Sequence, residues 1–247
     1  MKKIILIPCR LNSKRLQHKA LLEIDKKPLI IHTYLRSSLS NIADDVYVCT
    51  DSEKIIDICK KFNAKYIKTK SIHKNGTERI AEACNKLNLS SNDVIIDVQG
   101  DEPLIDPKQI DNVIHFFIKN KFEIVVPNIK TLDGNKPNIV KLLVDNKNKV
   151  QWMTRSASPL NFNGIKFDFL KHLSIIAFTK KSLIKYSKLK PSKYEKIESI
   201  ELLRAIENEM NVGSFSLKSE SFSIDIIDDY IRAKKFFSTD KIKKRYK

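Results

Sequence analysis

The first half of the chain alternates short runs of branched apolar residues with longer amphipathic stretches. The apolar runs predict strands at Ile4–Pro8, Val46–Thr50, Tyr66–Lys68, Val94–Val98 and Ile124–Pro127. The stretches between them predict helices near Pro28–Ser38, Ser52–Phe62, Thr77–Lys86 and Pro107–Lys119. This alternation is typical of an α/β fold, in which a mostly parallel sheet is covered by helices on both faces.

From about Val140 the pattern changes, and we expect an inserted β-rich lobe. A hairpin is predicted at 140–144 and 150–153, with later strands at Leu173–Phe178 and Val212–Ser216. Further helices are predicted at Lys181–Lys188, Ile197–Asn208 and Ile227–Phe237. Since no linker-like stretch divides the chain, we expect one domain over residues 1–240 and a solvated, frayed basic tail at 241–247.

Composition narrows the class of protein. Hydrophobic residues make up 42% of the 247 residues, enough for a sizeable core. No apolar run approaches the roughly 20 residues of a membrane helix, and the run at Ile4–Pro8 is too short for a signal-peptide core. The four cysteines are scattered, without the spacing of a disulfide framework or a zinc site. We therefore expect a cytoplasmic protein with no membrane partner.

The net charge of +17 raises the question of nucleic-acid binding. Only eight of the 46 basic residues are arginine, the residue suited to bidentate phosphate contacts, and lysine is spread over almost every segment. This distribution favours solubility and attraction of small anions, so nucleic acid is not expected as a partner. A non-enzymatic binder of acidic polymers stays open as an alternative.

The first candidate site is the loop Pro8–Lys19, which follows the first predicted strand. Ligands of open α/β sheets bind at the carboxyl ends of strands. Arg10, Arg15 and Lys19, together with Ser13, provide charged and hydroxyl donors that can surround a triphosphate. The alternative is an ordinary basic surface loop.

Two carboxylates complete this candidate site. Asp101 follows the buried strand Val94–Val98 in the sequence Gln-Gly-Asp-Glu-Pro, so it is expected at the same sheet edge. A carboxylate beside a phosphate-binding loop suits a hard cation such as Mg²⁺. Asp225 precedes the last predicted helix, where it serves as a second metal ligand, as the helix N-cap, or as both. The alternative for Asp101 is a turn or helix cap.

Several polar groups carry a weaker signal. Thr77 and Arg79 follow Gly76 at a predicted helix N-terminus, which favours polar or anionic ligands. Arg155 and His172 are isolated basic residues, and a lone histidine is more often structural than functional. The sequence also places Glu198, Glu201 and Arg204 on one face of the predicted helix Ile197–Asn208.

These clusters, in this order, resemble the 3-deoxy-manno-octulosonate (Kdo) cytidylyltransferases over roughly residues 1–237. The most specific matches are the loop Pro8–Lys19, the segment Gly76–Arg79 and the segment Val98–Ile105. The resemblance implies a nucleotide-diphospho-sugar transferase fold of Rossmann-like type, usually a homodimer. It also implies that CTP and Kdo react, with Mg²⁺, to give CMP-Kdo and pyrophosphate for lipopolysaccharide synthesis.

The resemblance assigns roles to individual residues. It implies that CTP is bound by Arg10, Ser13, Arg15, Lys19, Thr77 and Arg79. It implies that Mg²⁺ is bound by Asp101 and Asp225, which with Arg10 and Lys19 form the catalytic set. It implies that the acidic sugar is contacted by Gln99, Arg155, His172 and Glu201.

The sugar-binding half departs from the family pattern. The changes lie at Ala157–Leu160, Ser174–Ile176, Leu202 and Ile226–Asp229. The acidic sugar is therefore either Kdo or another 3-deoxy-ulosonic acid, such as 8-amino-Kdo. A sugar-1-phosphate uridylyl- or guanylyltransferase shares the fold, but its first loop is usually rich in glycine, and Cys9–Leu16 contains none.

Overall fold

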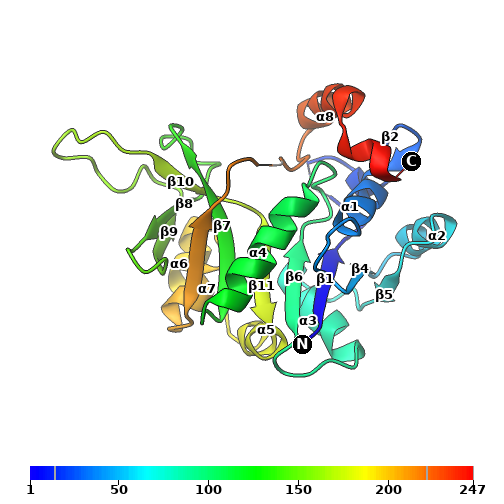
Figure 1. Ribbon diagram of the computed structural model, residues 1–247, viewed down its shortest axis with the longest axis horizontal. Coiled ribbons are helices and arrows are strands. Elements are labelled where there is room, and N and C mark those ends of the chain that lie inside the picture. The colour runs from blue at the N-terminus through cyan, green and yellow to red at the C-terminus, as the bar shows by residue number, and fades with distance from the viewer. Residues whose placement is uncertain (14, 221, 247) are drawn as a thin grey trace.

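The computed structural model describes residues 1–13, 15–220 and 222–246, so Lys14 of the predicted phosphate loop and Lys247 of the predicted tail lie outside the described residues. One mixed sheet of ten strands has the order β5-β4-β1-β6-β11-β7-β10-β8-β9, and β12 also pairs with β7. A small separate hairpin joins β2 (Glu23–Ile24) to β3 (Lys27–Pro28). The expected α/β sheet flanked by helices is confirmed (Figure 1).

The first half builds the parallel part of the sheet. Its strands are β1 (Lys3–Pro8), β4 (Asp45–Thr50), β5 (Tyr66–Lys68) and β6 (Val94–Val98). β1 lies between β4 and β6, and Leu6 pairs with both Tyr47 and Asp97. Both central strands are almost entirely buried, as their continuous apolar sequences predict. The carboxyl ends of β1 and β6 are therefore neighbours.

The second half adds the β-rich lobe. It consists of β7 (Ile124–Thr131), β8 (Lys141–Val144), β9 (Val150–Thr154), β10 (Phe169–His172), β11 (Ile175–Thr179) and β12 (Val212–Ser216). β11 runs antiparallel to both β6 and β7 and so joins the two halves into one sheet. The connection between β9 and β10 extends away from the sheet (Figure 1).

Helices cover both faces of the sheet. One core contains apolar residues of α1 (Leu29–Ser37), α2 (Glu53–Lys61) and α4 (Pro107–Lys119). The opposite core contains those of α3 (Gly76–Lys86), α5 (Lys180–Ser187) and α7 (Leu203–Glu207). The short α6 (Lys193–Glu198) precedes α7, and η1 (Lys19–Leu21) follows the first loop. Successive side chains of β1 point to opposite faces of the sheet and so pack into one core and then the other.

The predicted helix Ile197–Asn208 is wrong in its bounds. α6 ends at Glu198, and Ser199 adopts a left-handed conformation with φ of 53°. The Glu198 carboxylate accepts hydrogen bonds from the Thr154 hydroxyl and the Arg155 amide, which hold it against β9. Glu201 consequently lies in a turn before α7, so Glu198, Glu201 and Arg204 do not share one helix face.

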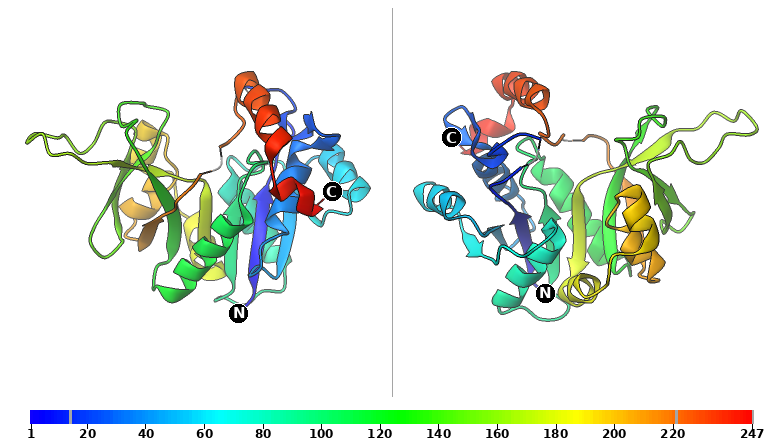
Figure 2. Two further views of the ribbon diagram at one scale, coloured as in Figure 1. Left: turned by 45° about the horizontal axis from the view of Figure 1, so that its top comes forward. Right: turned by 180° about the vertical axis from the view of Figure 1, so that it is seen from behind.

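The C-terminal segment is ordered rather than frayed. After α8 (Ile227–Thr239), residues Ile242–Tyr246 form a short 3₁₀ helix beside α1 (Figure 2). Asp240 pairs with the buried Arg36 of α1 at 2.5 Å, and the Tyr246 hydroxyl lies 3.2 Å from His32 Nδ1. The basic composition alone did not reveal these contacts. In the described part of the chain, no helix is long and apolar enough to cross a membrane.

Candidate active site

A cavity of about 330 Å³ opens at the carboxyl ends of β1 and β6. Predicted nucleotide ligands that line it are Arg10, Ser13, Arg15, Lys19 and Arg79. The cavity is also lined by Gln99, Asp101 and Asp225. The topology therefore brings together residues from the first loop, the end of β6 and the start of α8.

Close packing of backbone shapes the floor of this cavity. A Cβ built on Gly100 would lie 2.9 Å from the Pro8 carbonyl oxygen and 3.2 Å from Ile30 Cδ1. Any side chain at this position would push the β6 loop away from the β1 loop. Because Gly100 has no side chain, the loops that follow β1 and β6 can pack against each other.

The acidic and basic groups of the cavity contact one another directly. Lys19 Nζ lies 2.7 Å from Asp101 Oδ2 and 3.1 Å from Asp225 Oδ1. Arg15 Nη2 lies 2.8 Å from the same oxygen of Asp225. The Ile224 amide donates to the Asp101 carbonyl at 2.9 Å, which fixes the segment that carries Asp225 beside the β6 loop. The two carboxylates can therefore share one cation.

The donor set fits a hard divalent cation in part. Two carboxylates supply oxygen ligands of the kind that Mg²⁺ prefers. Among the described residues there is no group of three or more His, Cys, Asp and Glu that could hold a metal ion. The chain offers two ligands, and a cation here would complete its shell with phosphate oxygens and water, as Mg²⁺ usually does.

His73, which the sequence did not indicate as a site residue, lines the cavity and contacts a carboxylate behind it. His73 Nε2 contacts Glu82 Oε2 at 2.5 Å, and Lys86 Nζ contacts the other carboxylate oxygen at 2.8 Å. Burial opposes ionisation of Glu82, but the bonds from Lys86 and His73 outweigh it and lower the pKa of Glu82 to about 2. No motif signals His73; its place two residues before the Asn75 N-cap of α3 was the available clue.

Arg79 lines the cavity but is already engaged. Its Nη1 donates to the Thr69 hydroxyl at 2.6 Å and pairs with Asp51 Oδ1 at 2.9 Å. The residue is 5% exposed. Arg79 therefore stiffens the wall formed by the β5–α3 connection, and its remaining donors are the ones free to meet a ligand.

Gln99 is oriented by a buried carboxyl. Its Nε2 donates to Asp97 Oδ1 at 2.9 Å, and its Oε1 lies 3.7 Å from the position of a Cβ built on Gly76. Asp97 is fully buried in β6, and its Oδ2 has no hydrogen-bond partner among the described residues. Burial, together with the charges of Glu201 and Asp101, raises the pKa of Asp97 well above its usual value. Asp97 therefore orients the Gln99 amide, and its burial favours the neutral carboxyl.

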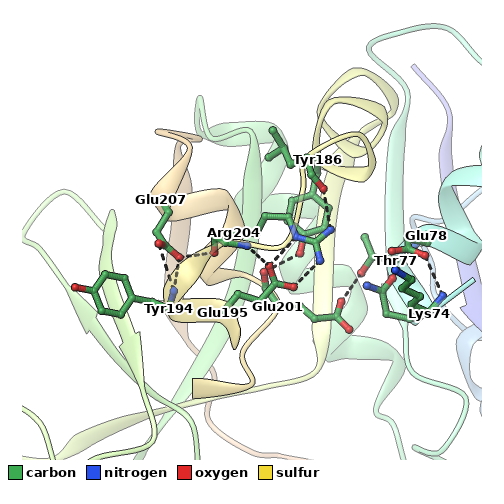
Figure 3. Close-up of polar contacts among 12 residues, drawn as sticks. Lys74, Thr77, Glu78, Tyr186, Tyr194, Glu195, Glu201, Arg204 and Glu207 are labelled. Atoms are coloured by element: carbon green, nitrogen blue, oxygen red, sulfur yellow. Dashed lines mark hydrogen bonds and ion pairs between the residues drawn. The ribbon is translucent and has the colours of Figure 1, made fainter. Parts of the chain in front are cut away.

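Thr77 and Glu201 contact each other outside the lining of this cavity. The Thr77 hydroxyl donates to Glu201 Oε2 at 3.2 Å, which connects α3 to the turn before α7 (Figure 3). The backbone of the same turn is held by the Tyr186 hydroxyl, which donates to the Glu201 carbonyl at 2.8 Å. The predicted nucleotide ligand Thr77 and the predicted sugar ligand Glu201 thus form a bridge between the two lobes.

Arg155 and His172 lie apart from the lining residues. Arg155 donates from its guanidinium to the carbonyls of Glu198, Pro137 and Ser199 at 2.7–3.2 Å. His172 Nε2 is buried and has no partner among the described residues; burial lowers the pKa of this ring to about 4, so it is neutral at pH 7. The guanidinium of Arg155 is thus engaged by backbone carbonyls, and the predicted roles of Arg155 and His172 toward the sugar stay predictions.

The arrangement suits phosphate transfer without a protein nucleophile. Cationic side chains of one loop pair with two carboxylates in the lining of a cavity of about 330 Å³. Cys9 also lines the cavity, but burial and the nearby Cys59 and Asp101 raise the pKa of its thiol, which stays protonated. Positioning and charge neutralisation are therefore the means of catalysis that these side chains offer.

Comparison with known proteins agrees with this geometry. The sequence pattern of the cytidylyltransferase family matches residues 4–212. The chain belongs to the cytidylyltransferase family. It is a nucleotidyltransferase, as the motifs around Pro8–Lys19 and Asp101 predict.

Two relatives are named for the acidic sugar on which they act. The chain is 35% identical over 242 residues to a 3-deoxy-manno-octulosonate cytidylyltransferase of Chloroherpeton thalassium, covering 95% of this chain and 97% of that protein. It is also 35% identical over 212 residues to an 8-amino-3,8-dideoxy-manno-octulosonate cytidylyltransferase of Shewanella frigidimarina, covering 84% and 86%. These two relatives of equal identity act on different acidic sugars.

A solved structure shares the whole fold. It is a CMP:2-keto-3-deoxy-manno-octonic acid synthetase in complex with CTP, with a TM-score of 0.92 and 29% identity. The match covers 96% of this cytidylyltransferase and 99% of that chain. The resemblance inferred from the sequence is therefore confirmed at the level of family and fold.

Proposed function

We propose that this cytidylyltransferase joins CTP to Kdo and releases pyrophosphate. The observation that carries the proposal is the cavity in which Arg10, Arg15 and Lys19 face Asp101 and Asp225 at the ends of β1 and β6. Its support is the 35% identity to a named Kdo cytidylyltransferase and the similarity to a relative solved with CTP.

In the proposed reaction the anomeric hydroxyl of the sugar attacks the α-phosphorus of CTP, and pyrophosphate departs on the opposite side. Arg10, Arg15 and Lys19 bind the triphosphate and stabilise the negative charge that builds on pyrophosphate. Ser13 adds a hydroxyl donor to the same loop. Gln99 presents its carbonyl oxygen toward Gly76, where it can accept a hydrogen bond from a sugar hydroxyl.

Mg²⁺, which we place at Asp101 and Asp225, would supply Lewis-acid neutralisation of the phosphate charge. Both carboxylates line the cavity and would hold the cation there. Thr77 and Glu201 keep the lobes in register while the substrates are bound. We also propose that the protein is cytoplasmic, since its four cysteines are free and buried, and that it forms a homodimer.

A second sugar is also a candidate substrate. The Shewanella frigidimarina relative, also 35% identical but over 84% rather than 95% of this chain, is named for 8-amino-3,8-dideoxy-manno-octulosonate. The Gln99 carbonyl oxygen in the cavity is an acceptor, so the amino group of such a sugar could donate to it. The 8-amino sugar is therefore the alternative substrate.

Pyrophosphate release tests the function. Purified protein with Mg²⁺ is assayed with each of the four NTPs, in combination with Kdo, 8-amino-Kdo and related sugar acids. Turnover only with CTP and Kdo supports the main proposal, and turnover with CTP and 8-amino-Kdo supports the alternative. Turnover with no pair would contradict both.

A matched pair of variants ties the activity to the site. Asp101→Asn should reduce turnover by at least about a hundredfold, the size of effect expected for losing one stabiliser of transition-state charge. Asp106→Asn makes the same change five residues later, at the N-cap of α4, where asparagine caps equally well. We expect this control to keep full activity, and equal losses in the two variants would argue against a role for Asp101.

A further inference from the structure

The ammonium of Lys19 lies between the two carboxylates to which the proposed function assigns Mg²⁺. Its distances of 2.7 Å to Asp101 and 3.1 Å to Asp225 are those of direct ion pairs. The Lys19 side chain is 13% exposed, and the carboxylates are 29% and 35% exposed. The lysine is therefore enclosed by the site, while the carboxylates stay accessible from the cavity.

A divalent cation and this ammonium compete for the same oxygens. Each carries positive charge, and like charges a few ångströms apart repel each other. Arg15, 2.8 Å from Asp225, adds to the repulsion. Binding of the cation alone would require Lys19 to leave two partners and gain none.

A triphosphate changes this balance because it offers Lys19 new anionic partners. The backbone of Lys19 is fixed at the start of η1, where its carbonyl accepts from the Leu22 amide at 3.1 Å. The flexible four-carbon stem of lysine still lets Nζ move several ångströms without backbone motion. The same side chain can therefore pair with Asp101 and Asp225 or with phosphate oxygens.

We propose that Lys19 acts as an internal counter-cation that excludes divalent metal until nucleotide binds. The cation then enters with, or after, the triphosphate, because Lys19 transfers from the carboxylates to the phosphates. This inference rests on the proposed metal role of Asp101 and Asp225. It gives Lys19 a second task besides binding phosphate.

Mn²⁺ binding measured without turnover tests this exchange. Mn²⁺ is titrated into nucleotide-free protein, and free Mn²⁺ is counted from its electron paramagnetic resonance signal. Lys19→Met should bind Mn²⁺ about tenfold more tightly than the unaltered protein, since no ammonium pairs with the two carboxylates in this variant. Lys19→Arg keeps the charge and should bind as weakly as the unaltered protein.

Two controls isolate the local effect. Lys54→Met removes one positive charge from the exposed surface of α2 and should leave Mn²⁺ affinity unchanged. Asp101→Asn, added to Lys19→Met, should abolish the gain. Circular dichroism checks each fold, and Lys19→Gln replaces Lys19→Met if the latter is misfolded.

The outcomes separate this inference from the proposed function. Equal Mn²⁺ affinity in the unaltered protein and Lys19→Met, or no binding by either, overturns the exchange. Mn²⁺ binding by the unaltered protein in the presence of CTP, beyond that of CTP alone, would then still support the metal site. Failure of CTP to bind would instead contradict the proposed function itself.

Discussion

Glu195 and Arg204 form a buried ion pair near the contact between Thr77 and Glu201. Arg204 Nε lies 2.8 Å from Glu195 Oε2, and its Nη2 lies 2.5 Å from Oε1, so the contact is bidentate (Figure 3). The two side chains are 3% and 10% exposed. The guanidinium also lies 5.3 Å from the ring centroid of Tyr186. The pair fastens α6 to α7 on either side of Glu201.

Glu195→Gln should destabilise the protein strongly because it leaves a buried guanidinium without its counter-charge. Breaking one partner of such a pair costs about 3–5 kcal/mol. For a chain of this size, each kcal/mol lowers Tm by about 2–4 °C, so we expect a decrease of about 6–20 °C. The double variant Glu195→Gln/Arg204→Met should lose less than the sum of the single losses, with a coupling of about 1–3 kcal/mol.

Urea unfolding followed by tryptophan fluorescence suits this measurement. Trp152, the single tryptophan, packs edge-on against Tyr194 of α6 with ring centroids 5.0 Å apart. Glu53→Gln, which removes the partner of Lys68 in a pair that is 62–63% exposed, is the control and should change stability little. A loss below about 1 kcal/mol for Glu195→Gln, or additive losses in the double variant, would refute the reasoning.

Three further predictions concern other parts of the chain. Asp97→Asn should stabilise the protein increasingly as pH rises above about 4, because burial raises the pKa of Asp97 and ionisation then favours the unfolded chain. The urea midpoints of the variant and the unaltered protein at pH 5 and pH 8 measure this effect. A difference between the two proteins that does not change with pH would contradict it. Gly100→Ala should lower the free energy of unfolding by about 1–3 kcal/mol, because the new methyl group would meet the Pro8 carbonyl, and should raise KM for CTP. Urea unfolding and steady-state kinetics measure the two effects. An unchanged stability and KM would contradict the close approach of the two loops. Phe162→Ser, on the projecting β9–β10 connection where Phe162 is 89% exposed, should shift the proposed homodimer toward monomer in sedimentation without loss of folding; unaltered sedimentation would place the interface elsewhere.

The site residues near strand ends could be predicted from the sequence, while those that depend on tertiary contacts could not. Asp101 directly follows a buried parallel strand, and Arg10 to Lys19 follow its neighbour, so topology alone brings them together. The break at Ser199 depends on Glu198 meeting β9, a contact between segments 44 residues apart in sequence. No local pattern encodes such a contact, and the helical spacing of Glu198, Glu201 and Arg204 was misleading for that reason.

The ordered C-terminal segment escaped prediction for a similar reason. Residues 241–247 contain mostly lysine and arginine, a composition typical of solvated tails. The 3₁₀ helix Ile242–Tyr246 is held in place by Asp240, which pairs with Arg36, and by Tyr246, which packs beside His32 at a centroid distance of 5.9 Å. Asp25, which receives Lys243, adds a third attachment. Each partner lies more than 200 residues earlier in the chain.

The hydrogen bond from Ile224 to Asp101 has a consequence for how the molecule is made. The last sheet strand ends at Ser216, so a ribosome has released every strand before it releases Asp225. A nascent chain halted at about residue 217 would hold a complete sheet with half of its carboxylate pair. If Asp225 holds the proposed Mg²⁺, such a chain would keep the residues proposed to bind the triphosphate but would lack one of the two metal ligands.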